Sequence, residues 1–156
     1  MNTKRISHIR FTKEGYEEII SRLNKLLEKR KRVLIDLQTA REMGDLSENG
    51  AYKAARWELG GIDRQIRHLI YLKRFGRVAN SETKKKIVGF GTKVTILSGD
   101  AKMVFTMVEG YEADPGKNKL SLYSPLGKAI LGKKENDKAI FHTPSGEKTL
   151  QIISID

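Results

Sequence analysis

Gly44-Asp45-Leu46-Ser47-Glu48-Asn49 is a short acidic segment that separates two long stretches of helical periodicity. One stretch runs up to it from Thr12, which is suited to cap a helix, and the other runs away from it toward Arg74. Two helices of similar length joined by a short connector lie antiparallel. The segment therefore predicts the tip of a helical hairpin, with two carboxylates at the end of a long rod.

Both helical stretches carry an apolar stripe that alternates spacings of three and four residues, which is the repeat of a coiled coil. Helices of about 25–30 residues would give a rod of roughly 40–45 Å. Arg30 interrupts the first stripe, and Gly60-Gly61 interrupts the second helical pattern at a cost of about 1 kcal/mol per glycine. The glycines predict either a close approach of the helices or a bend. The stripes comprise Tyr16, Ile19, Leu23, Leu26, Val33, Leu37 and Ala40, then Ala55, Leu59, Ile62, Ile66 and Leu69.

Length and composition exclude several classes of protein. A chain of 156 residues accommodates one large domain or two small ones. Cysteine is absent, which excludes disulfides, thiolate metal sites and a cysteine nucleophile. The N-terminus has no apolar segment of a signal peptide, and no apolar run approaches the roughly 18 residues that span a bilayer. We expect a cytoplasmic protein that does not engage a membrane.

The chain is strongly basic, with 30 Lys and Arg against 19 Asp and Glu and a net charge of +11. Residues 1–80 carry 18 basic and 10 acidic groups, a net of +8, and residues 81–156 carry 12 and 9, a net of +3. A field of this sign attracts nucleic acid or an acidic protein surface. The charge therefore favours a nucleic-acid-related role over that of a merely solvated rod.

The C-terminal half changes to strand-like periodicity after a polar linker at residues 80–86. Five segments alternate or run apolar between clusters of Gly, Asp, Asn and Pro, at residues 93–97, 103–108, 119–123, 138–142 and 148–155. Ser124 is suited to cap a short helix that begins at Pro125. The pattern predicts an antiparallel sheet with one short helix. The fold class is therefore α+β, with a coiled-coil domain at residues 1–79 and a sheet domain at residues 80–156.

Ordinary turn chemistry explains part of the acidic tip. Gly44 can end the first helix in the left-handed conformation, and Ser47 or Asn49 can cap the second. The positive end of the second helix also favours Asp45 and Glu48. These carboxylates are three residues apart and can share Mg²⁺, which typically takes one or two protein carboxylates and keeps several waters. They do not complete a metal site alone, so a partner must supply the remaining ligands.

The tip segment, followed by Ala51-Tyr52 and Ala54-Ala55-Arg56, resembles the tip motif of the bacterial transcript cleavage factors of the GreA/GreB family. In the C-terminal half, residues 90–94, 124–133 and 143–147 match the pattern of that family in order and spacing. The resemblance covers essentially the whole chain. The high charge of the N-terminal half is closer to GreB and the Ala54-Ala55-Arg56 block closer to GreA, which leaves the subtype open.

The resemblance implies a transcription elongation factor whose coiled coil enters the secondary channel of bacterial RNA polymerase. Its C-terminal domain would be FKBP-like and would dock at the rim of the channel. The tip acids would help the polymerase to cleave backtracked RNA, with Asp45 as the main ligand of a shared Mg²⁺ and Glu48 ligating the ion or positioning water. Such a factor would be monomeric, would bind no cofactor alone and would not be an enzyme in its own right.

The resemblance also implies that residues other than the two acids contact RNA or the polymerase. Arg41 and Arg56 match positions near the 3′ end of the extruded RNA, and Lys53 is a further candidate from its neighbourhood. Ser124 and Pro125 match the loop that touches the polymerase rim. Tyr123 departs from the pattern, because the family usually has a small polar or acidic residue there.

Three alternatives stay open at this point. A relative of the same fold could occupy the polymerase channel and inhibit transcription. A basic coiled coil could bind nucleic acid without specificity, with an affinity that falls steeply with salt. An FKBP-like peptidyl-prolyl isomerase would need an aromatic-lined proline pocket, for which the C-terminal half offers only Phe90, Phe105, Tyr111, Tyr123 and Phe141.

Overall fold

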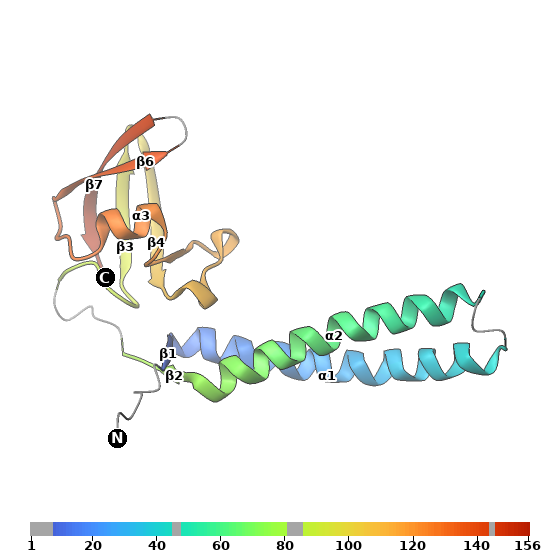
Figure 1. The fold of residues 1–156 in the computed structure, drawn as a ribbon. Helices are drawn as coiled ribbons and strands as arrows, with labels where there is room; N and C mark the ends of the chain where they lie inside the picture. Colours follow the sequence, from blue (N-terminus) through green and yellow to red (C-terminus); the bar gives the residue numbers. More distant parts are fainter. Residues whose placement is uncertain (1–7, 45–47, 81–85, 144–145) are drawn as a thin grey trace, which may run out of the picture. The chain divides into compact units, whose positions relative to one another are not determined.

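A computed structural model of the chain describes residues 8–44, 48–80, 86–143 and 146–156 (Figure 1). The chain divides into two compact units. The helical unit contains Glu14–Arg77, and the sheet unit contains Val78–Asp156 together with the N-terminal segment Arg10–Lys13. None of the helices in the described ranges is long and apolar enough to cross a membrane.

The helical unit is an antiparallel hairpin of two long helices, α1 (Lys13–Glu42) and α2 (Gly50–Phe75), as the sequence predicts (Figure 1). Each helix buries residues of its predicted apolar stripe. Removal of this apolar surface from water is the main term that holds a two-helix unit together. The buried members are Ile19, Leu23, Val33 and Ala40 on α1, and Ala55, Ile62, Ile66 and Leu69 on α2. Leu72, which was not part of the predicted stripe, is also buried on α2.

Hydrogen bonds between the two helices fix their register. At the base, the hydroxyl of Tyr16 donates to the carbonyl of Lys73 at 3.1 Å. Near the tip, Nδ2 of Asn49 donates to the carbonyl of Ala40 at 2.6 Å. Asn49 also caps α2, because its side-chain oxygen accepts the backbone N–H of Tyr52 at 3.0 Å. The predicted cap at Asn49 is therefore confirmed, and the same side chain ties the two helices together.

The residues that interrupt the stripes have different surroundings. Arg30 reaches across to α2, where its Nε lies 2.7 Å from Oδ1 of Asp63. Gly60 and Gly61 lie within α2, which continues through them as one helix. A methyl group built on Gly60 would meet nothing within 4 Å, and one on Gly61 only the Nη2 of Arg64, at 4.0 Å. Close packing of the helices, one of the two expected explanations, is therefore wrong for both glycines.

The described residues of the sheet unit form a five-stranded sheet whose strands lie at predicted positions (Figure 1). They are β3 (Lys93–Ser98), β4 (Ala101–Val108), β5 (Lys119–Ser121), β6 (Lys138–Thr143) and β7 (Gly146–Ile155), in the spatial order β5-β4-β3-β7-β6. A separate two-stranded sheet pairs β1 (Ile9–Phe11) with β2 (Gly76–Val78).

Edge strand β5 departs from the expected antiparallel arrangement. Strands β4, β3, β7 and β6 pair antiparallel, but β5 runs parallel to β4. The connection between them contains two short 3-10 helices, η2 (Gly110–Glu112) and η3 (Pro115–Lys117), and leads the chain back so that Lys119 pairs with Thr106. Asp114 forms a turn in this connection, with its side chain accepting the N–H of Gly116 at 2.9 Å. It belongs to a longer return path and not to a hairpin.

The core of the sheet unit lies between the sheet and a short helix, α3 (Pro125–Ile130), which packs beside β6. The core residues are apolar and almost completely buried, because a unit of this size depends on such a core for its stability. The members of the core are Val88, Phe90, Val94, Ile96, Met107, Leu122, Ile130, Ala139, Leu150, Ile152 and Ile155.

A buried carboxylate holds the N-terminal segment in the sheet unit. Glu112 is only 8% exposed and accepts the backbone N–H of Thr12 at 2.9 Å, as well as the Thr12 hydroxyl. The ammonium of Lys119 donates to the same carboxylate at 3.1 Å. Thr12 stands directly before α1, where the sequence predicts a cap. Buried charges are retained where they are paired in this way.

Candidate functional site

The acidic tip lies between the end of α1 and the start of α2. Gly44 has a φ of 91°, so the predicted left-handed residue after the first helix is confirmed. Glu48 is exposed in the turn directly before the cap of α2. The positive end of that helix favours its carboxylate without burying it. Asp45, the predicted main metal ligand, and Ser47, the alternative cap, lie outside the described residues.

Three predicted RNA-contacting residues lie at the same end of the hairpin as Glu48. Arg41 is exposed in the last turn of α1, while Lys53 and Arg56 are exposed in the first two turns of α2. None of the three forms an ion pair with an acid in the part of the chain that the structure describes. Their charges are therefore available to an anionic partner.

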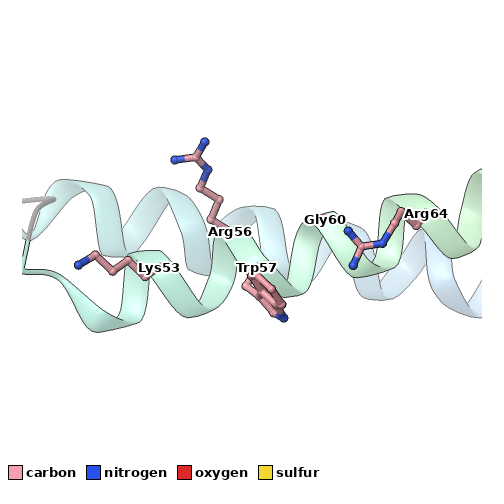
Figure 2. Close-up of a pocket in the computed structure, with 5 residues that line it drawn as sticks. All are labelled: Lys53, Arg56, Trp57, Gly60 and Arg64. Carbon is pink, nitrogen blue, oxygen red and sulfur yellow. The ribbon is translucent and has the colours of Figure 1, made fainter.

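A fourth feature near the tip was missed by the sequence analysis. The side chain of Trp57 is 81% exposed on α2. Together with Lys53, Arg56, Gly60 and Arg64 it lines an open depression of about 250 Å³ (Figure 2). The sequence carried a signal for it, because Trp57 falls outside the spacing of the apolar stripe and must face outward.

The predicted docking segment is held firmly at the start of α3. The hydroxyl of Ser124 accepts the N–H of Gly127 at 3.0 Å and donates to the carbonyl of Ser121 at 2.7 Å. Pro125 is exposed at the first position of the helix, so the predicted cap and helix start are both confirmed. A Cβ at Gly127 would lie 2.0 Å from the Ser121 oxygen, a contact that only glycine avoids. The close approach fixes the conformation of the corner formed by the half-buried Ser124 and the exposed Pro125.

Tyr123, which departs from the family pattern, is 62% exposed beside this corner. A hydrogen bond to Glu109 raises the pKa of the Tyr123 hydroxyl, and the negative charge of Glu109 acts in the same direction. The Glu109 carboxylate is in turn paired with Arg10, at 2.9 Å from Nε and 2.8 Å from Nη2. The guanidinium lies 4.8 Å from the ring centroid of Phe90, within cation–π range. Tyr123 thus belongs to a connected polar cluster at the surface of the sheet unit.

The aromatic residues that an isomerase pocket would need are largely used by the core. Phe90 is buried there, and Phe105 and Phe141 pack against it. Tyr111 and Tyr123 are exposed. Among the described residues, no cluster of three or more His, Asp and Glu side chains is arranged to hold a metal ion.

Comparisons with known proteins agree with this architecture. The family model described as "Transcription elongation factor, N-terminal" matches residues 9–72, and the model "Transcription elongation factor, GreA/GreB, C-term" matches residues 82–156. The chain is 34% identical to transcription elongation factor GreA of Helicobacter hepaticus over 148 residues, which cover 92% of this chain and 91% of that protein. It is 37% identical to GreA of Novosphingobium aromaticivorans over 146 residues, 92% of each chain.

Among solved structures, the GreA factor homolog 1 of Thermus thermophilus is 25% identical, with a TM-score of 0.46 over 96% of this chain and 99% of that one. The helical hairpin with its acidic tip and the β-rich second unit define a two-part α+β protein. The chain belongs to the GreA/GreB family of transcription elongation factors.

Proposed function

We propose that this elongation factor acts on bacterial RNA polymerase by inserting its helical hairpin into the secondary channel. There it would stimulate the polymerase to cleave backtracked RNA and so rescue arrested complexes in the bacterial cytoplasm. The observation that supports this most directly is an acidic turn at the end of a basic hairpin. Glu48 is exposed at this turn, at the positive end of α2.

The hairpin is suited to reach a recessed site. Helix α1 has 30 residues and α2 has 26, so at 1.5 Å per residue the rod is about 40–45 Å long. The buried apolar residues of both helices and the Arg30–Asp63 pair, which bridges the interruption in the first stripe, hold the two helices together along this length. A rod of this build can carry its tip to a reaction centre while the rest of the chain stays outside.

The donor set at the tip fits Mg²⁺. Carboxylate oxygens are the hard ligands that this ion prefers, and it commonly takes one or two of them from a protein. Asp45 would act as the main ligand, and Glu48 would add a second oxygen or orient the attacking water. A metal ion at such a site stabilises the charge on the attacking and leaving oxygens of a phosphodiester. Polymerase would supply the remaining ligands, so the factor completes an active site and needs no enzyme activity or cofactor of its own.

The cations around the tip would hold the RNA. Arg41 and Arg56 carry planar guanidinium groups that bind phosphate oxygens in a bidentate manner, and Lys53 adds a point charge. All three are exposed at the tip end of the hairpin. Ser124 and Pro125 would dock at the channel rim, since Pro125 is exposed, Ser124 is partly exposed, and the conformation of their corner is fixed by Gly127. The factor would act as a monomer.

The test is RNA cleavage in a backtracked bacterial elongation complex. We expect the wild-type chain to accelerate cleavage and the double variant Asp45→Asn, Glu48→Gln to bind polymerase without doing so. A matched control, Glu17→Gln with Asp36→Asn, makes the same charge change at exposed positions of α1 and should keep full activity.

Two outcomes would contradict the proposal. If the wild-type chain binds polymerase but leaves the cleavage rate unchanged, a channel-binding inhibitor of the same fold is the better description. If it does not bind polymerase at all, the isomerase and nucleic-acid alternatives return.

A further inference from the structure

The methionines of the chain differ widely in their access to solvent. Cysteine is absent, so the four methionine thioethers carry the only sulfur atoms on which an oxidant can act. Met107 is fully buried in the core of the sheet unit, and Met103 is half-buried against the same core. Met43 is 73% exposed, and Met1 lies outside the described residues. Met43 is therefore the exposed methionine of the part of the chain that the structure describes.

Met43 is held at a defined position in the acidic tip. It follows directly after α1, two residues before Asp45. Its backbone N–H donates to the carbonyl of Ala40 at 3.3 Å, and the same carbonyl accepts Nδ2 of Asn49, the cap of α2. One carbonyl oxygen thus links the backbone of Met43 to the start of the helix that Glu48 precedes. A chemical change at Met43 therefore takes place at the tip itself.

Oxidation would change the chemical character of this position. A sulfoxide turns the flexible, apolar methionine side chain into a polar one. In the free chain the new oxygen would stay hydrated, because Met43 is exposed, and the fold would be unaffected. In a complex that covers the tip, the same oxygen would lose its water, and a buried polar group without a hydrogen-bond partner weakens binding. The modification would therefore be silent in folding and measurable in binding.

We propose that Met43 is a peroxide-sensitive modification site, and that its conversion to the sulfoxide weakens the binding of the tip to RNA polymerase. The thioether sulfur takes one oxygen atom from hydrogen peroxide as the O–O bond breaks, and the other oxygen leaves as water. Sulfur gives up two electrons, which the peroxide accepts. A methionine sulfoxide reductase with a dithiol reverses the step, releasing the oxygen as water and the dithiol as a disulfide. The effect on binding, but not the oxidation itself, rests on the proposed function.

The site is mapped on the full chain without polymerase. Hydrogen peroxide is added, and the sulfoxide at each methionine is followed over time by mass spectrometry of proteolytic peptides. We expect the Met43 peptide to gain its oxygen while Met103 and Met107 stay reduced, because the core shields them. In urea, where the fold is lost, all three should react at similar rates. Oxidation of Met103 or Met107 as fast as that of Met43 in the folded chain would overturn the proposal.

The consequence is measured as the affinity for a backtracked elongation complex. Oxidised wild-type chain should bind about 5- to 150-fold more weakly than reduced chain, as expected for one polar group left unpaired, and treatment with the reductase should restore the affinity. Met43→Leu has no sulfur at this position, so its affinity should be the same before and after peroxide. Met43→Gln places a polar group there and should weaken binding without peroxide.

Met103→Leu is the matched control, since it removes a half-buried methionine of the sheet unit and should remain as sensitive to peroxide as the wild type. An affinity of the wild type that oxidation leaves unchanged would overturn the proposal, as would a Met43→Leu variant that is still weakened by peroxide. The two proposals fail separately because binding is measured without cleavage. Binding without stimulated cleavage would refute only the proposed function, and stimulated cleavage with an affinity insensitive to oxidation would refute only this inference.

Discussion

The Gly127→Ala substitution tests how the Ser124-Pro125 corner is built. The new methyl group would lie 2.0 Å from the carbonyl oxygen of Ser121. That oxygen accepts the N–H of Ser124 at 3.1 Å and its hydroxyl at 2.7 Å. Contacts of a Cβ atom below 3.0 Å essentially do not occur, so α3 and the end of β5 must separate by at least about 1 Å. Such a movement would weaken both hydrogen bonds and the cap of α3.

The expected loss of stability follows from these two effects. Forcing an extra methyl group into a packed site costs about 1–3 kcal/mol, and loss of a helix cap costs about 1 kcal/mol. We therefore expect Gly127→Ala to lower the free energy of unfolding of the sheet unit by about 2–4 kcal/mol. At about 4–8 °C per kcal/mol for a unit of this size, its melting temperature should fall by roughly 8–30 °C.

The assay must follow the sheet unit separately from the hairpin. Tryptophan fluorescence reports only the hairpin, because Trp57 lies in α2. Scanning calorimetry detects the unfolding of both units, so the transition that does not coincide with the change in Trp57 fluorescence is that of the sheet unit. Gly60→Ala is the matched control, since it makes the same chemical change with no atom within 4 Å and should stabilise α2 by about 1 kcal/mol. A melting temperature for Gly127→Ala within about 2 °C of the wild type would refute the reasoning.

Three further predictions concern polar contacts. Arg30→Leu should change the free energy of unfolding by less than about 1 kcal/mol, measured by urea denaturation, because its pair with Asp63 is partly exposed and leucine restores the apolar stripe. Glu112→Gln should destabilise the sheet unit by about 2–4 kcal/mol in calorimetry, because it removes a buried charge that accepts three hydrogen bonds. Tyr123 should titrate above its ordinary pKa of about 10, since the hydrogen bond to Glu109 favours the neutral hydroxyl. The hydrogen bond from Tyr123 to Glu109 therefore stabilises the folded state fully below about pH 10, and this stabilisation is lost as the pH rises through the raised pKa of Tyr123. Tyr123→Phe should remove both this loss of stability at high pH and the ionisation step of Tyr123 in a titration followed by ultraviolet absorbance.

The candidate site was only partly accessible from the sequence. The position of the tip, the cap at Asn49 and the exposure of Glu48 follow from local patterns, and the structure agrees with them. The roles of Glu48 and of the cations beside it stay predictions, as does that of Asp45, which lies outside the described residues. The open depression beside Trp57 was missed because an exposed aromatic residue gains meaning only once Glu58 and Asp63 are seen to pair with the other helix.

The sequence by itself determined the two helices, the turn between them, the five strands and the cap of α3. Each of these depends on a repeat or a turn residue within a few positions, so local propensity and burial are sufficient to specify it. The tertiary structure alone decided that β5 runs parallel to β4, that Arg30 pairs with Asp63, and that Glu112 holds Thr12 in the sheet unit. The last two contacts join residues 33 and 100 positions apart. Their partners are selected by the path of the chain and the geometry of packing, which no local pattern encodes.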